Sequence, residues 1–181
     1  LVGASDILGA SANVFEVLNN ADLKFPVVTD ETGSKVELSN GVYGKLLEST
    51  ARPVRREAFE QLYAVYKQFR HTFAATLSAH VRKHNFSAKL RNYQSAKEAS
   101  LAQNDIPVAV YDTLVKTVNE NLGLLHEYVA LRKDILGVDE LHMYDMYTPL
   151  TGEPTLTFTY KQAKKMTLEA LSVLGEEYLA Y

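Results

Sequence analysis

Three groups of residues have types and spacings that could do chemistry, and the first is an incomplete zinc-peptidase motif. His126-Glu127-Tyr128-Val129-Ala130 matches HExxH except that alanine replaces the second histidine. The complete motif works because two histidines four residues apart share a helix face and bind zinc together, while the glutamate activates water. One histidine cannot do this. We therefore interpret His126 as a partly buried, hydrogen-bonded residue and Glu127 as a solvated one.

The second group is His80 and His84, whose spacing places both rings on one helix face, in line with Phe73 and Leu77. Val81 stands where a zinc peptidase has its glutamate. Two histidines also fall short of the three or four protein ligands that zinc takes. We interpret the pair as packing residues, at which only weak, adventitious binding of nickel or zinc is expected.

The third group is Glu140, His142 and Asp145, which could form an acid/base cluster. No nucleophile or set of metal ligands accompanies them, so we favour a helix-to-loop corner held by hydrogen bonds. The sequence has no GxSxG elbow and no phosphate-binding glycine loop. The prediction is therefore that these residues supply no catalytic group and no metal ligand, and it assigns no substrate-binding residue.

Composition excludes several other classes of protein. The 181 residues are 46% apolar and 23% charged with a net charge of −3, so a nucleic-acid-binding surface is not indicated. Arg52, Arg55 and Arg56 alternate with acids such as Glu57 and Glu60, which predicts solvated helix faces. Cysteine is absent, which excludes disulfides and fits a cytoplasmic protein. No apolar run approaches a membrane span of about 18 residues.

Eleven tyrosines are many for this length. Tyrosine favours surfaces that are apolar on one side and wet on the other, so a wall beside a water-filled channel would explain the count. Half-buried core tyrosines would explain it equally well.

Helices must position most of these residues, because apolar residues recur at steps of three and four over much of the chain. The predicted organisation is two short helices in residues 1–21, a β-hairpin in 22–38 that turns at Gly33, and a helical lobe in 39–181. Within the lobe we expect helices over 39–49, 53–90, from 95, 105–136 and from 159, with a connector over 143–158. Capping boxes at Ser95 and Thr159 mark two starts, and Gly137 marks a left-handed stop.

The predicted fold class is therefore mainly α, with long antiparallel helices in a bundle-like lobe and one small β-hairpin. The chain starts at Leu1 rather than at Met and stops at Tyr181 inside a helical pattern. We expect a single segment of a larger protein, truncated at both ends, with some self-association through former interfaces.

Several segments resemble one known family in order and spacing. They are NNADLKFP (19–26), YGKLLES (43–49), HTFAATLS (71–78), NDIPVAVYDTLVKTVNENLGLLHEYVALRK (104–133) and LRKDILGVDELHMYDMYTPL (131–150). Together they resemble oligoendopeptidase F, a bacterial group within the thimet-oligopeptidase-like zinc metallopeptidases, and the similarity covers nearly the whole chain.

That resemblance implies a parent enzyme that uses zinc to cut short peptides. Its zinc helix, with a histidine pair and a downstream glutamate as ligands, would lie C-terminal to Tyr181, so the present residues would bind no cofactor and be inactive alone. They would form part of the wall of the substrate cavity. The expected partners are short peptides and the remaining domains of the same protein, and no nucleic acid or membrane is expected as a partner. One alternative is a self-standing helical protein-interaction module. The other is a helical protein that binds nucleic acid, which the net charge of −3 disfavours.

Overall fold

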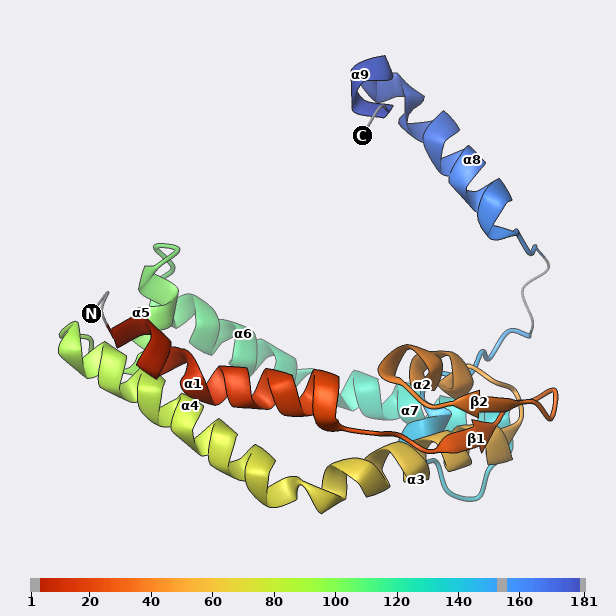
Figure 1. Ribbon diagram of the computed structural model, residues 1–181, viewed down its shortest axis with the longest axis horizontal. Helices are drawn as coiled ribbons and strands as arrows, with labels where there is room; N and C mark the ends of the chain where they lie inside the picture. Colours follow the sequence, from red (N-terminus) through yellow and green to blue (C-terminus); the bar gives the residue numbers. More distant parts are fainter. Residues whose placement is uncertain (1–3, 153–155, 180–181) are drawn as a thin grey trace. The chain divides into compact units, whose positions relative to one another are not determined.

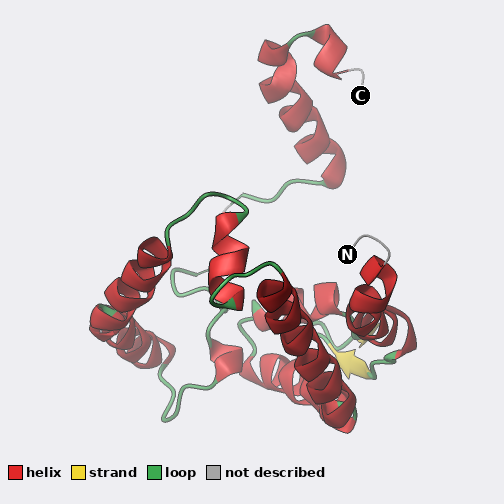
Figure 2. Ribbon diagram, turned by 90° about the vertical axis from the view of Figure 1, so that its left-hand side faces the viewer, coloured by secondary structure: helices red, strands yellow, loops and turns green. Residues whose placement is uncertain are grey.

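The computed structural model describes residues 4–152 and 156–179, which are mostly helical (Figure 1). The α-helices are α1 (Ser5–Val17), α2 (Asn40–Leu47), α3 (Arg52–Gln68), α4 (Arg70–Leu90), α5 (Ala96–Ala102), α6 (Val108–Glu120), α7 (Leu122–Leu136), α8 (Tyr160–Leu171) and α9 (Glu176–Leu179). The π-helix η2 (Leu18–Asp22) and the 3₁₀ helices η3 (Met143–Asp145) and η4 (Ser172–Leu174) are short. Strands β1 (Val27–Thr29) and β2 (Lys35–Glu37) form one antiparallel pair, which Figure 2 shows among the helices. The predicted mainly α fold with one small β-hairpin is confirmed.

The hairpin forms where the sequence predicts it, although its strands are shorter than the predicted runs. Gly33 takes a φ of +82°, a conformation that glycine adopts without steric cost, and its N–H donates to the Asp30 carbonyl at 3.1 Å. Val28 pairs with Val36 and is 1% exposed. The hairpin is thereby fixed on α2 and α3, where the main core contains Val28, Leu38, Leu46, Ala58 and Leu62.

A second, smaller core joins the first helix to the long helical arm. Helices α1 and α4 lie side by side (Figure 1), and the turn after α1 buries Leu18 and Leu23 against Val65. The two short helices that the sequence predicts in residues 1–21 are not separated at Gly9, because α1 is continuous from Ser5 to Val17. Tertiary packing on α4 therefore overrides the low helix propensity of glycine.

Both long predicted helices are divided. The segment 53–90 is interrupted at Phe69 (φ −102°, ψ 14°), whose ring packs against the second core. The segment 105–136 is interrupted at Asn121 (φ −107°, ψ 8°). The Asn121 side chain donates to the Thr117 carbonyl at 2.8 Å, so it competes with the helical backbone for that acceptor.

Helices α6 and α7 carry apolar faces that the described residues leave uncovered. On α6 the exposed large hydrophobic residues are Val110, Tyr111, Leu114, Val115 and Val118. On α7 the half-buried side holds Leu122, Val129 and Leu136, while an opposite stripe of Leu124, Tyr128, Leu131 and Ile135 is exposed. A helix that is apolar on two sides is typical of the interior of a larger structure.

The chain divides into two compact units, Leu1–Leu150 and Thr151–Tyr181. In the second unit, α8 begins with the predicted capping box, because Thr159 and Gln162 bond to each other's backbone N–H groups. The predicted continuous final helix is shorter than expected, since Gly175 at a φ of +93° separates η4 from α9. Within residues 4–152 and 156–179, no helix combines the length and the apolar character needed to cross a membrane.

Candidate functional site

The most organised polar site surrounds Asp145 in η3, whose side chain is 0% exposed. Its Oδ1 accepts from Arg55 Nη2 at 2.7 Å, and its Oδ2 accepts from Arg52 Nη2 at 3.0 Å. The backbone N–H of His142 also donates to Oδ2 at 3.0 Å. Both carboxylate oxygens are therefore saturated by donors.

Two buried arginines extend this site to the backbone. Arg55, 2% exposed, donates to the carbonyls of Ser49 at 2.8 Å and Tyr144 at 3.2 Å. Arg132, 4% exposed, donates to the carbonyl of Asp145 at 2.9 Å and to that of Thr148. We call Asp145, Arg52, Arg55 and Arg132 the Asp145 cluster, and it ties α3 and α7 to the η3 corner.

The cluster fixes the charge of Asp145. Burial alone raises the pKa of its carboxyl, but hydrogen bonds from Arg52, Arg55 and the His142 N–H outweigh burial and lower the pKa to about 2. The same contact raises the pKa of Arg52 above its ordinary value, mainly through the hydrogen bond to Asp145. A carboxylate that is ionised, saturated and closed to solvent cannot accept a proton from a substrate. Asp145 is therefore a structural anion.

The side chains of Glu140 and His142, the other two candidate acid/base residues, are exposed, unlike the buried Asp145 carboxylate. The Glu140 side chain is 81% exposed, and its Oε2 is 4.0 Å from His142 Nε2. The His142 ring stacks on Tyr144 with centroids 4.9 Å apart, and the Glu140 carbonyl accepts from Arg52 at 2.8 Å. The segment is the hydrogen-bonded corner that the sequence favours.

The arginines are what sequence reasoning missed. The prediction that Arg55 lies on a solvated face is wrong, because Arg55 is 2% exposed and donates to the carbonyls of Ser49, in the loop after α2, and Tyr144, in η3. The signal was its spacing: Arg55 precedes Ala58 and Leu62 by three and seven residues, so it shares their buried face. Arg132 likewise follows Val129 by three residues on the half-buried side of α7.

The truncated motif on α7 is more exposed than predicted. His126 and Glu127 are both exposed in the structure, so the expectation of a partly buried His126 is wrong. That expectation assumed that the apolar face beside His126 packs on other helices, and within the described residues Leu125 remains 51% exposed.

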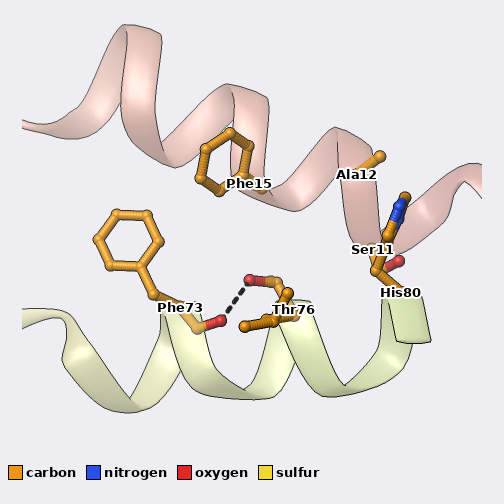
Figure 3. Close-up of a pocket in the computed structure, with 7 residues that line it drawn as sticks. Ser11, Ala12, Phe15, Phe73, Thr76 and His80 are labelled. Carbon is orange, nitrogen blue, oxygen red and sulfur yellow. Dashed lines mark hydrogen bonds between the residues drawn. The ribbon is translucent and has the colours of Figure 1, made fainter. Parts of the chain in front are cut away.

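The histidine pair on α4 has close geometry. Nε2 of His84 lies 3.0 Å from Nε2 of His80, and the ring centroids are 4.5 Å apart. His80 also lines a cavity of about 360 Å³ between α1 and α4, together with Ser11, Ala12, Phe15, Phe73, Thr76 and Leu77. Figure 3 shows the rings of Phe15 and Phe73 near each other at one end of this cavity, where they meet edge-on with centroids 5.8 Å apart, and His80 at the other end.

Tyrosines gather near the η3 corner. Burial, followed by the neighbouring hydroxyls of Tyr63 and Tyr147, raises the pKa of half-buried Tyr43 to about 12. Tyr147 is 64% exposed and Met143 is 66% exposed. Both line a hollow of about 500 Å³ whose other residues are Val129, Leu141, His142 and Met146, and which we call the α7–η3 hollow.

Residues able to hold a metal ion are sparse in the described ranges. No three His, Cys, Asp or Glu side chains within residues 4–152 and 156–179 approach closely enough to hold one. The pair His80 and His84 supplies two nitrogen atoms, and Asp145 is already saturated by arginines. This donor set does not fit a catalytic zinc ion, which takes three protein ligands.

Comparison with known families gives one match. The sequence profile described as Peptidase family M3 matches residues 45–174, which is most of the chain. The match includes the Asp145 cluster, α6 and α7.

Curated relatives are similar over almost the whole chain. Oligopeptidase PepF of Bacillus subtilis (strain 168) is 49% identical over 178 residues, which is 98% of this chain and 27% of that protein. Group B oligopeptidase PepB of Streptococcus agalactiae is also 49% identical over 98% of this chain and 30% of its own length. The chain therefore spans less than a third of the length of these relatives.

Two solved structures share the fold. Oligoendopeptidase-F from Enterococcus faecium is 58% identical with a TM-score of 0.82, over 99% of this chain and 34% of that one. A putative peptidase from Chlamydophila abortus is 31% identical with a TM-score of 0.79, over 99% and 30%. The resemblance to oligoendopeptidase F that the sequence suggests is confirmed.

Proposed function

Because the chain belongs to peptidase family M3, we propose that the whole protein is a zinc-dependent endopeptidase of short peptides and that these residues are a non-catalytic helical part of it. The matched relatives carry the names oligopeptidase and oligoendopeptidase, and they are roughly three times as long as this chain. The absence of cysteine suits a cytoplasmic enzyme.

The zinc ion belongs, in this proposal, to a part of the protein outside these residues. A catalytic zinc needs three convergent ligands and an open position for water, and the described donor set offers two imidazoles on one helix. We therefore expect the isolated chain to be inactive.

The observation that carries the structural role is the uncovered apolar surface of α6 and α7. Leu114 is 61% exposed and Val118 is 54% exposed on one helix, while Leu124 is 66% exposed on the next. Contiguous exposed apolar faces mark interfaces. We infer that further segments of the same protein cover these faces and that unit 1 forms part of a helical lobe.

The α7–η3 hollow is the surface that we assign to the wall of the substrate cavity. It is apolar, it is rimmed by Tyr147 and Met143, and the Asp145 cluster fixes the corner that carries both. Side chains of this kind give contact area to peptides without selecting one sequence.

The test begins with the complete reading frame that contains this chain. Purified whole protein is expected to cleave internally quenched peptides of about ten residues, and a zinc chelator is expected to abolish the cleavage. The 181-residue chain supplied with zinc is expected to cleave nothing. Chelator-sensitive cleavage by the chain alone would show that the active site has been misplaced. An inactive whole protein would favour the helical interaction module instead.

The wall is tested in the same whole protein. Tyr147→Ala is expected to raise KM for peptides several-fold with kcat little changed, because a ground-state contact is lost. The control is Glu37→Ala, at an exposed position on β2. Equal KM values for the two variants would refute the assignment of the α7–η3 hollow to the cavity.

A further inference from the structure

We propose that His80 and His84 on α4 form a chelating site for a divalent transition-metal ion of the copper and nickel type. The site is separate from the catalytic zinc of the proposed peptidase and does not depend on that activity. It uses only two side chains of one helix, and both are present in the described structure.

Geometry carries the proposal. The Nε2 atoms of His80 and His84 are 3.0 Å apart, so one nitrogen from each ring lies at the same place beside the helix. With metal–nitrogen bonds of about 2.05 Å, two ligands at a right angle lie about 2.9 Å apart, whereas tetrahedral ligands lie about 3.3 Å apart. The observed separation is that of a hydrogen bond between the two rings, and it shows that both Nε2 atoms come within reach of a single ion.

The site is accessible and needs little rearrangement. His84 is exposed, and His80 is half-buried at the end of the α1–α4 cavity. In the metal-free pair one imidazole donates to the other, so one Nε2 carries a proton. Moving that proton to Nδ1 of the same ring frees the second lone pair, and the pair then binds the cation without net loss of a proton.

The number of ligands sets the strength of binding. Two imidazoles leave the remaining positions of the ion to water, so we expect affinities in the micromolar range rather than those of closed structural sites. The preference among ions should follow the general order for nitrogen ligands, with copper(II) tighter than nickel(II) and zinc(II).

The experiment is calorimetry of the tag-free chain with copper(II), nickel(II) and zinc(II) salts. One equivalent of copper(II) is expected to bind, at least tenfold more tightly than zinc(II). His84→Ala is expected to weaken copper(II) binding at least tenfold, and His126→Ala, which removes an exposed histidine of α7, is expected to leave it unchanged.

Exchanging His84 with the adjacent Asn85 is a sharper control than His84→Ala. The double variant His84→Asn with Asn85→His keeps the composition of the chain but turns the second imidazole away from His80 by about 100°. The proposal expects this variant to lose binding as fully as His84→Ala, and it expects the copper(II) electron paramagnetic resonance spectrum of the native chain to show two equatorial nitrogens. Unchanged affinity in the swapped variant, or absence of one-to-one binding by the native chain, would overturn it.

Discussion

Replacing Asp145 by asparagine removes the carboxylate that pairs with Arg55, whose side chain is 3% exposed. The lowering of the Asp145 pKa from 3.8 to about 2 corresponds to about 2 to 3 kcal/mol of stabilisation in the folded state. That figure compares ionised with protonated Asp145 and does not include the cost of leaving Arg55 without a carboxylate. Leaving a guanidinium buried without its counter-charge typically costs about 3 to 5 kcal/mol, so we expect Asp145→Asn to destabilise the chain by about that larger amount.

The assay is urea unfolding at pH 7, followed by circular dichroism at 222 nm. The matched control is Asp134→Asn, at an exposed position on α7, which should change the free energy of unfolding by less than about 0.5 kcal/mol. A loss below about 1 kcal/mol in Asp145→Asn would refute the reasoning, because the buried guanidinium would then not need its carboxylate.

Three further outcomes follow from described features. Since the folded Asp145 pKa lies below the unfolded value, its stabilisation is present above pH 4 and is lost as pH falls toward 2. The stability difference between native chain and Asp145→Asn should therefore shrink over that window in urea titrations at stepped pH. The isolated chain should self-associate through α6, and Leu114→Lys with Val118→Lys should reduce the mass seen in sedimentation, with unchanged mass contradicting this. Gly137→Ala, at a φ of +62°, should lower the free energy of unfolding by about 1 kcal/mol, whereas Gly41→Ala, in open space on α2, should not.

Local signals in the sequence predicted local structure well. Gly33 and Gly137 both take the positive φ that their positions demanded, and Thr159 begins α8 as its capping box indicates. Each of these features depends on a few neighbouring residues, whose preferences act without help from distant parts of the chain.

The misses come from contacts between distant residues. The spacing of Arg55 from Ala58 and Leu62 signals its buried face, but its partner Asp145 lies ninety positions away and no local pattern reveals it. The interruption at Phe69, whose side chain packs against the core of Leu18, Leu23 and Val65, has no breaker beside it in the sequence. The exposure of His126 could not be predicted either, because the apolar face beside it has no cover among the described residues.

The long span between Arg55 and Asp145 also bears on how the first unit folds. Closing a loop of ninety residues costs about 4 kcal/mol in chain entropy, which exceeds the contribution of about 2 to 3 kcal/mol from the ionised Asp145. The pair alone therefore cannot bring the segments together. The ring contact of Phe59 with Tyr144, at 5.7 Å, and the bond from Thr148 to the Ser49 carbonyl must form with it. We expect contacts of low sequence separation, in the hairpin and along α4, to form early, and closure of the η3 corner to be the slow step.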